Sequence, residues 1–306
     1  MARPMDRELD KAVADSMNLF ERARVRPAAA ITPRRPSHLL LAIDHSTQDA
    51  TSIEIVRRLA RRFACRATVV DARENAGSNE RAVAVASQLD AQAAPKATGD
   101  SYEQILTAVE QSDCDLLVVP CPFGRDLNSV GPNSAGTVID VLLARSPVPL
   151  LVIREPYEPE EEIFHSILMI LTVENAAAPA AAAWAAGLAT PEGMLELELV
   201  LEKEMYENIN TLMRSIAPDV DVSEDALSEA LARAHTCLHQ GLQKTASEMG
   251  IRYRLKIRLE DEISPLEVDT RSLIVLALER SDHTSQGNVQ GRIRLSSHPV
   301  LVVCRE

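Results

Sequence analysis

A short apolar motif occurs twice in this chain, each time after a glycine that opens a helical pattern. The first copy reads SPVPLLVIRE, and the second, SSHPVLVVCRE, lies at the end of the chain. Pro149 and Pro299 are 150 residues apart in a chain of 306 residues. The preceding tripeptides are Gly-Thr-Val at 136–138 and Gly-Asn-Val at 287–289. A motif that recurs at half the chain length predicts one structural unit used twice.

Composition favours a folded protein that binds neither nucleic acid nor membrane. Hydrophobic residues make up 46% of the chain and charged residues 25%, as in globular proteins. No segment offers the roughly 20 apolar residues of a membrane span, and Asp6 and Glu8 stand where a secretory leader is basic. The net charge of −13 is unsuited to a phosphate backbone. We therefore expect a soluble, cytoplasmic protein.

Residues 1–37 form a separate piece. Apolar residues at near-helical spacing predict one amphipathic helix; they are Met5, Leu9, Val13, Met17 and Phe20. A proline-rich linker follows this helix. We interpret the helix as a cover for its own protein, and the alternative is a helix that docks on a partner.

Apolar runs alternate with helical patterns through the first unit, residues 38–155. The predicted strands are 38–44, 67–71, 116–120 and 148–154, and the predicted helices begin after Ser46 or Thr47, at 80, at a Ser101 cap and at Gly136. This alternation predicts a mostly parallel sheet with helices on both faces.

An acidic linker leads to the second unit, residues 163–306. Its predicted strands are 166–174, 195–202, 252–260, 272–279 and 299–304. The acidic alternation of LELELVLE predicts one wetter face for the second strand, and 223–250 reads as one long helix capped at Ser223. The segment between 260 and 272 is too short for the helix that 101–112 forms in the first unit. The second unit is therefore expected to be degenerate.

The order HLLLAID, TGDxxxxIL, DLLVVP, GTVxxxLLxxSPVPLLVIR resembles the universal stress protein family. The chain resembles a tandem member, closely over 38–154 and weakly over 165–306. The resemblance implies a five-stranded parallel sheet of the nucleotide-binding α/β type in each unit. It also implies ATP or another adenine nucleotide as ligand, as in many members. In the family the last strand often pairs across a dimer. The resemblance implies that the last strands of the two units here pair with each other within one chain. Formation of a homodimer is left as an alternative.

The resemblance implies a nucleotide site at the carboxyl ends of the first unit's strands, where open parallel sheets bind ligands. The predicted site residues are Ala42, Asp44, Val70, Pro120, Gly124, Gly136, Thr137 and Val138. An acid in the position of Asp44 lies near the ribose in the family. An Asp just before Ser46 and Thr47 also fits a helix cap or a partner for its amides, so both roles stay open.

The loop expected to hold phosphates departs from the family pattern. Family members carry Gly-x-x-Gly, nine residues and Gly-Ser/Thr, because glycine lets backbone N–H groups approach phosphate oxygens. Here Gly124 is followed by Leu127 in place of the second glycine, and only eight residues separate Leu127 from Gly136. Pro120 and Pro122 also lack N–H donors. Gly136-Thr137 is intact, and Arg125 is expected to supply a charge. These departures predict a weakened nucleotide site.

In the second unit, Thr172 replaces the acid and the loop before Gly287 is short. We therefore expect this unit to be structural and to bind no nucleotide. The function predicted for the whole chain is binding or signalling rather than catalysis, and slow ATP hydrolysis through Asp44 and the 124–137 loop is the alternative.

Other chemistries find little support in the sequence. A dinucleotide-dependent oxidoreductase would need GxGxxG after the first strand, and HSTQDA follows Asp44 instead. His235 and His239 share a helix face, but Cys237 points away and no third ligand is evident, so we predict no metal. The five cysteines form no CxxC and are interpreted as small core residues.

Overall fold

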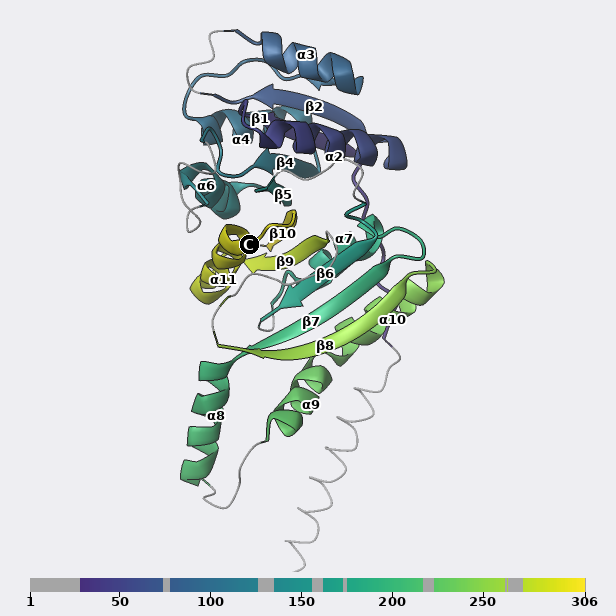
Figure 1. The fold of residues 1–306 in the computed structure, drawn as a ribbon, viewed down its shortest axis with the longest axis vertical. Coiled ribbons are helices and arrows are strands. Elements are labelled where there is room, and N and C mark those ends of the chain that lie inside the picture. Colours follow the sequence, from purple (N-terminus) through teal and green to yellow (C-terminus); the bar gives the residue numbers. More distant parts are fainter. Residues whose placement is uncertain are drawn as a thin grey trace, which may run out of the picture.

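A single sheet runs through the molecule and positions its helices (Figure 1). The computed structural model describes residues 28–73, 78–125, 135–155, 162–172, 175–216, 223–261, 263 and 272–305. Within these ranges the sheet has ten strands: β1 (His38–Ile43), β2 (Arg66–Asp71), β3 (Gln92–Ala93), β4 (Leu116–Pro120), β5 (Leu150–Ile153), β6 (Ser166–Leu171), β7 (Met194–Glu202), β8 (Arg252–Glu260), β9 (Leu273–Glu279) and β10 (Val300–Arg305).

The strand order is β3-β2-β1-β4-β5-β10-β9-β6-β7-β8. β5 and β10 pair antiparallel, with Val300 opposite Val152 and Val302 opposite Leu150. All other neighbouring pairs are parallel. The predicted pairing of the two motif copies within one chain is confirmed, and it is antiparallel. Outward from this contact, β4, β1, β2 and β3 follow the same order as β9, β6, β7 and β8.

Helices cover both faces of the sheet, which confirms the predicted α/β fold. One face packs against α2, α3, α7 and α10, and the other against α4, α6 and α11. No helix in the described ranges has the length and apolar content to cross a membrane. The helices are α2 (Gln48–Phe63), α3 (Glu80–Leu89), α4 (Ser101–Ser112), α6 (Thr137–Arg145), α7 (Ala178–Leu188), α8 (Lys203–Ile216), α9 (Glu224–Ala234), α10 (Thr236–Glu248) and α11 (His283–Leu295).

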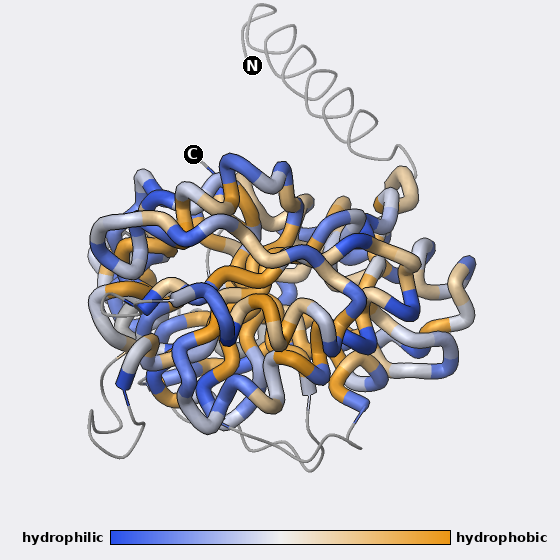
Figure 2. The backbone as a smooth tube through the Cα atoms, turned by 90° about the horizontal axis from the view of Figure 1, so that it is seen from above, coloured by the Kyte–Doolittle hydropathy of each residue, from blue (hydrophilic) through white to orange (hydrophobic). Residues whose placement is uncertain are grey.

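β1 shows why these apolar runs fold as central strands. Leu39 and Leu41 pack under α2, whereas Leu40 and Ala42 pack on the opposite face, because successive side chains alternate across a sheet. All four side chains are fully buried. A strand buried on both faces is apolar throughout, and hydrophobic stretches accordingly fill the middle of the molecule (Figure 2).

The helical part of the second half differs from the prediction. The expected single helix over 223–250 is two helices, α9 and α10, with His235 between them at φ −96° and ψ 14°. The predicted cap is confirmed, since the Ala226 N–H donates to the Ser223 hydroxyl at 3.2 Å. α8 was not predicted at all. In the first half, the cap of α4 is Asp100 rather than Ser101, and Glu103 accepts the Asp100 N–H in return.

The acidic alternation of β7 does not make a wet face, which corrects the sequence-based interpretation. Glu196 and Glu198 are 9% and 2% exposed. Basic side chains of the neighbouring strand β8 cover them: Arg254 pairs with Glu196, and the Arg258 Nε lies 2.6 Å from the Glu198 Oε1. Glu198 opposes Lys256 in the strand register. Buried charges are tolerated because each has a partner of opposite sign.

The segment leading into β1 crosses the second half before it enters the first. Ile31 exchanges two hydrogen bonds with the Thr245 hydroxyl of α10, at 2.8 and 2.9 Å. The Arg34 N–H donates to the Ala183 carbonyl of α7 at 2.8 Å. Residues 28–37, called the strap below, thus connect the two halves of the sheet. The predicted helix at Met5, Leu9, Val13, Met17 and Phe20 lies outside the described residues.

Candidate functional site

A cleft of about 580 Å³ opens where β1 and β4 end and α6 begins. Pockets for small ligands in proteins span roughly 300–1,000 Å³, so its size suits a small organic molecule. Its position at the carboxyl ends of parallel strands is where such sheets bind ligands. The lining residues are Asp44, Arg73, Asp100, Ser101, Tyr102, Phe123, Gly124, Arg125, Gly136, Thr137 and Val138.

Asp44 ties the end of β1 to the segment that follows β4. Its Oδ2 accepts the Gly124 N–H at 2.6 Å, and its Oδ1 accepts the Ser46 N–H at 2.9 Å. The residue is only 6% exposed. A carboxylate that accepts two backbone N–H bonds in a buried place stabilises the turn around it. These contacts support the role of Asp44 as a partner for nearby amides.

Asp49, on the first turn of α2, lies behind Asp44. Its two carboxylate oxygens accept the N–H groups of Asp44 and His45 at 3.2 and 3.0 Å. Burial raises the pKa of Asp49 to about 7, and the charge of Asp44 adds to this rise, against the two backbone hydrogen bonds. Burial and the nearby charge of Asp44 therefore favour the protonated form of Asp49 beneath the cleft.

We expect this buried carboxyl group to make stability depend on pH. The unfolded pKa is 3.8 and the folded pKa about 7, so the folded state holds the proton more tightly. The stabilising effect is complete below about pH 4 and is lost as the pH rises through 7. Asp49→Asn imitates the protonated form. Between pH 5 and pH 8, the wild-type free energy of unfolding should fall by roughly 2 kcal/mol relative to the variant. Urea unfolding at both pH values measures this, and parallel changes in the two proteins would contradict it.

The start of α6 presents backbone donors to the cleft. Gly136 is the N-cap at φ +86°, a conformation that favours glycine, and Thr137 and Val138 follow in the first turn. The first N–H groups of a helix have no partner within it, and the positive end of the helix dipole lies there. Gly124, at φ +71°, faces the same space. This part of the cleft suits an anionic group.

Two arginines bring positive charge to the cleft. Arg125 lines it directly beside Gly124, and Arg73 reaches it from the end of β2. Arg73 is held by a bidentate pair with the buried carboxylate of Asp71, at 3.0 and 2.9 Å. Burial alone would raise the pKa of Asp71, but the hydrogen bonds and charge of Arg73 lower it below its ordinary value. Asp71 is thus ionised and fixes the arginine at the rim.

The structure brings five of the eight predicted site residues to the wall of the cleft. These are Asp44, Gly124, Gly136, Thr137 and Val138. Ala42 and Val70 face each other as register partners on β1 and β2 and are buried, as is Pro120 at the end of β4. Arg125, expected to supply a charge, also lines the cleft, and the cleft residues that the prediction missed are Arg73, Asp100, Ser101, Tyr102 and Phe123. Arg73 follows a predicted strand by two residues, so the strand-end rule offered a signal for it.

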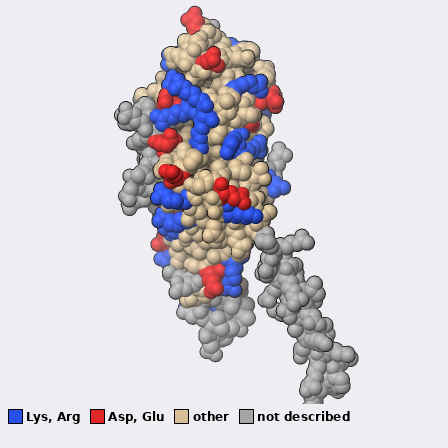
Figure 3. Space-filling view, turned by 90° about the vertical axis from the view of Figure 1, so that its right-hand side faces the viewer, with Lys and Arg blue, Asp and Glu red and all other residues tan. Residues whose placement is uncertain are grey.

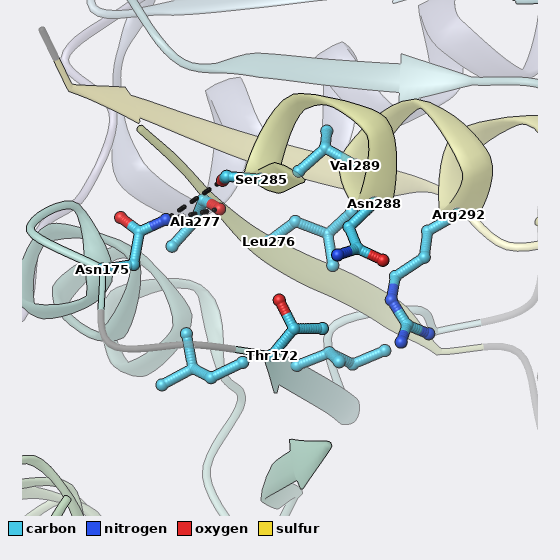
Figure 4. A pocket seen from close by; sticks show the side chains of 10 residues that line it. Thr172, Asn175, Leu276, Ala277, Ser285, Asn288, Val289 and Arg292 are labelled. Carbon is cyan, nitrogen blue, oxygen red and sulfur yellow. Dashed lines mark hydrogen bonds between the residues drawn. The ribbon is translucent and has the colours of Figure 1, made fainter. Parts of the chain in front are cut away.

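The corresponding place in the second half holds a much smaller cavity, of about 20 Å³ (Figure 4). Asn175 closes it by donating to the Ala277 carbonyl at 3.3 Å and to the Ser285 hydroxyl at 3.2 Å. Thr172 lies at the end of β6, where Asp44 follows β1 in the first half. A cavity of this size has room for about one water molecule.

The histidines considered as metal ligands have other partners. The His239 Nδ1 lies 2.8 Å from the Tyr253 hydroxyl, and their rings are 5.4 Å apart. Burial lowers the pKa of His239 and raises that of Tyr253, so both are neutral near pH 7. Within the described ranges, no group of three or more His, Cys, Asp or Glu side chains is placed to hold a metal ion.

Comparison with known proteins identifies the fold. No protein-family model and no curated protein matches the sequence. A candidate universal stress protein from Pseudomonas aeruginosa UCBPP-PA14 is similar at a TM-score of 0.55 and 12% identity, over 88% of this chain and 93% of that one. A universal stress protein from Archaeoglobus fulgidus DSM 4304 gives 0.54 and 14%, over 88% and 99%. A protein of unknown function from Pseudomonas aeruginosa PAO1 gives 0.55 and 12%, over 88% and 92%.

The chain therefore has the fold of the universal stress proteins. This confirms, at the level of fold, the resemblance found in the sequence motifs.

Proposed function

We propose that this chain is a binding or signalling protein of the universal stress type, whose first half holds an adenine nucleotide. The cleft between Asp44 and the start of α6 carries this proposal. It has the size of a small-ligand pocket and lies at the carboxyl ends of parallel strands. The second half offers only a water-sized cavity at the corresponding place, so we assign it a structural role.

The residues of the cleft fit a phosphate-bearing ligand. The backbone donors at Thr137 and Val138 lie at a helix start, where phosphate groups are stabilised. Gly136 adopts the positive φ of +86° from which α6 begins at the cleft wall. Arg73 and Arg125 would balance the phosphate charge at the rim. A bound nucleotide would supply a molecular signal, and the chain's own residues would bind and orient it.

Two features limit the affinity that we propose. The Gly124 N–H donates to Asp44, so it serves the loop rather than a phosphate oxygen. Pro120 and Pro122 have no N–H group to donate. The phosphate contacts therefore depend on the α6 end of the cleft and on the two arginines, and we propose weak binding.

Binding is proposed over slow hydrolysis because of how Asp44 is used. Both of its carboxylate oxygens accept backbone N–H bonds. Hydrolysis would require a group that orients the attacking water against a positioned phosphate. The Asp44 carboxylate instead holds the turn through these two hydrogen bonds, so it does not orient a water molecule.

We likewise propose that the strand order records a duplicated unit, with domains at 38–155 and 163–306. The same order of strands on each side of the β5–β10 pair supports this proposal. Antiparallel pairing of equivalent last strands within one chain would give the two domains an approximate twofold relation.

Asp44→Ala tests the role of the first cleft. We expect ATP affinity to fall at least about tenfold, because the turn that shapes the cleft loses its tether. The free energy of unfolding should fall by about 1–3 kcal/mol, since two N–H groups lose their acceptor. Calorimetry with ATP and urea unfolding measure the two effects. Thr47→Ala is the control, because this neighbour does not line the cleft and its hydroxyl donates to the Gln48 side chain. Unchanged ATP binding together with lost stability would show that Asp44 has a capping role alone.

Mass spectrometry of small molecules released from the denatured, purified protein tests the ligand class independently. An adenine nucleotide is the expected finding. A different molecule recovered in stoichiometric amount would contradict the proposed ligand.

A further inference from the structure

A second groove lies far from the nucleotide cleft, at the end of α2 where it meets the second half of the sheet. It has a volume of about 360 Å³ and is lined by Arg58, Arg61, Arg62, Glu162 and Phe164. We call it the arginine groove. Basic side chains, with acidic ones between them, gather on this side of the molecule (Figure 3). Three arginines in one groove are notable in a chain whose net charge is −13.

Arg62, which lines this groove, is held in place by several contacts. Its guanidinium donates to the carbonyl oxygens of Leu188 and Ala189, at the end of α7. It also lies 4.8 Å from the centre of the Phe63 ring and 6.0 Å from that of Phe164. Such contacts hold the guanidinium in one position. A ligand that binds it therefore loses little side-chain entropy of the arginine.

The other arginines differ in how far they are neutralised. Arg58 pairs with Glu54 one turn earlier at 3.0 Å. Arg61 is exposed and forms no hydrogen bond or ion pair with any residue that the structure describes. Arg61 therefore brings to the groove a positive charge that no described neighbour compensates.

The positive groups also repel one another. Burial lowers the pKa of the Arg62 guanidinium, and the nearby charge of Arg35 lowers it further, while Glu162 acts in the opposite direction. Arg35 lies over the Phe63 ring at 6.0 Å, on the edge of the same cluster. A negatively charged ligand would relieve this repulsion.

We infer that the arginine groove is a docking site for an acidic segment of a partner protein, in which Glu or Asp residues are interspersed with uncharged ones. Guanidinium groups bind carboxylates in a planar, bidentate manner. Arg58, Arg61 and Arg62 are spaced by three and four residues, so they lie on one helix face and can meet successive carboxylates. The Phe164 ring in the lining is only 2% exposed, so it supports the Arg62 guanidinium 6.0 Å away and offers no apolar surface of its own.

Charge favours a short acidic segment over the other polyanions. A nucleic acid would meet the negative field of the whole chain beyond the groove. Glu162 stands inside the groove and disfavours a small ligand that concentrates two charges, such as phosphate. A peptide can place its carboxylates on the arginines and an uncharged residue against Glu162.

Fluorescence anisotropy with a short labelled peptide rich in glutamate and leucine tests the inference on the full chain. Wild-type protein should bind it, and binding should weaken as salt is added. Arg61→Glu should weaken binding about tenfold or more, because it reverses a charge among several in the groove. Arg66→Glu changes an exposed arginine outside the groove and is the matched control, expected to change affinity less than about twofold.

The same assay contradicts the inference if the groove does not select acidic peptides. The version of the peptide with glutamine in place of glutamate should not bind. Equal binding of that peptide, equal losses in the Arg61 and Arg66 variants, or no binding by wild-type protein would each overturn the inference. Stronger competition by inorganic phosphate or a short oligonucleotide than by unlabelled peptide would also overturn it. Melting temperatures of the two variants should match, since both positions are exposed.

Discussion

Gly187→Leu is expected to lower the free energy of unfolding by about 3 kcal/mol, the largest stability effect of any single change considered for this protein. A Cβ atom on Gly187 would lie 1.8 Å from the Arg34 carbonyl oxygen, so any side chain pushes the strap off α7. Displacement removes the Arg34–Ala183 hydrogen bond and the stacking of the Arg34 guanidinium, 5.2 Å from the Trp184 ring. Equilibrium unfolding in urea measures the loss.

Other glycines in helices provide graded controls for this result. A Cβ on Gly241 would meet the Ala29 carbonyl oxygen at 3.0 Å, so Gly241→Ala should destabilise less. Gly287, in α11, has nothing within 4 Å of its added Cβ. Gly287→Ala should therefore leave stability unchanged or raise it by up to about 1 kcal/mol, as expected for helix propensity. Equal effects at Gly187 and Gly287 would show that the strap contributes nothing to stability.

Gly136→Val is expected to reduce nucleotide affinity at least about tenfold. Gly136 has φ +86°, which a β-branched residue adopts only with strain, and it precedes the donors at Thr137 and Val138. An added Cβ would lie 3.5 Å from the Pro122 Cβ, so a larger side chain would also displace the start of α6 and the donors it carries. Isothermal calorimetry with ATP measures the loss.

Two matched changes separate this effect from backbone strain. Gly250 also has a positive φ, of 68°, with nothing within 4 Å of an added Cβ, but it lies in the second half after α10. Gly250→Val should cost stability and leave affinity alone. Gly287→Val, at the glycine of the second motif copy, should likewise leave affinity unchanged. Equal losses of affinity in all three variants would contradict a site in the first half.

The parts of the fold that could be predicted are those where pattern and packing agree. β1 and β4 are buried on both faces, so their runs of apolar residues identify them without ambiguity. The repeated motif predicted the β5–β10 contact because an apolar last strand needs a partner for its exposed edge. These signals are local or are repeated in the sequence, and they do not depend on distant partners.

Other features depend on contacts that the sequence does not display. The alternating glutamates of β7 look solvent-exposed until β8, with its arginines, lies beside them. The break at His235 comes without a proline or glycine. Gly187 and Gly241 look like poor helix residues, and only the strap across α7 and α10 explains them.

The candidate site was predicted in outline because several of its residues occupy positions that the sequence identifies. Asp44, Gly124 and Gly136 stand at strand ends or at a helix start, and strand ends and glycines are readable from sequence. That the Asp44 carboxylate would bind the Gly124 N–H, 80 residues away, was not predictable. The pKa of Asp49 is likewise set by burial and by Asp44, which only the folded chain brings together.

Hydrogen–deuterium exchange with and without ATP tests the central claim most directly, because it reports where on the chain a ligand protects backbone N–H groups. The first-half cleft predicts slower exchange in peptides covering 41–47 and 135–140, around Asp44 and the start of α6. Peptides covering 166–172 and 283–290, around the small cavity of the second half, should exchange at the same rate in both conditions. Protection confined to the second half, or no change anywhere at saturating ATP, would contradict a nucleotide site in the first half.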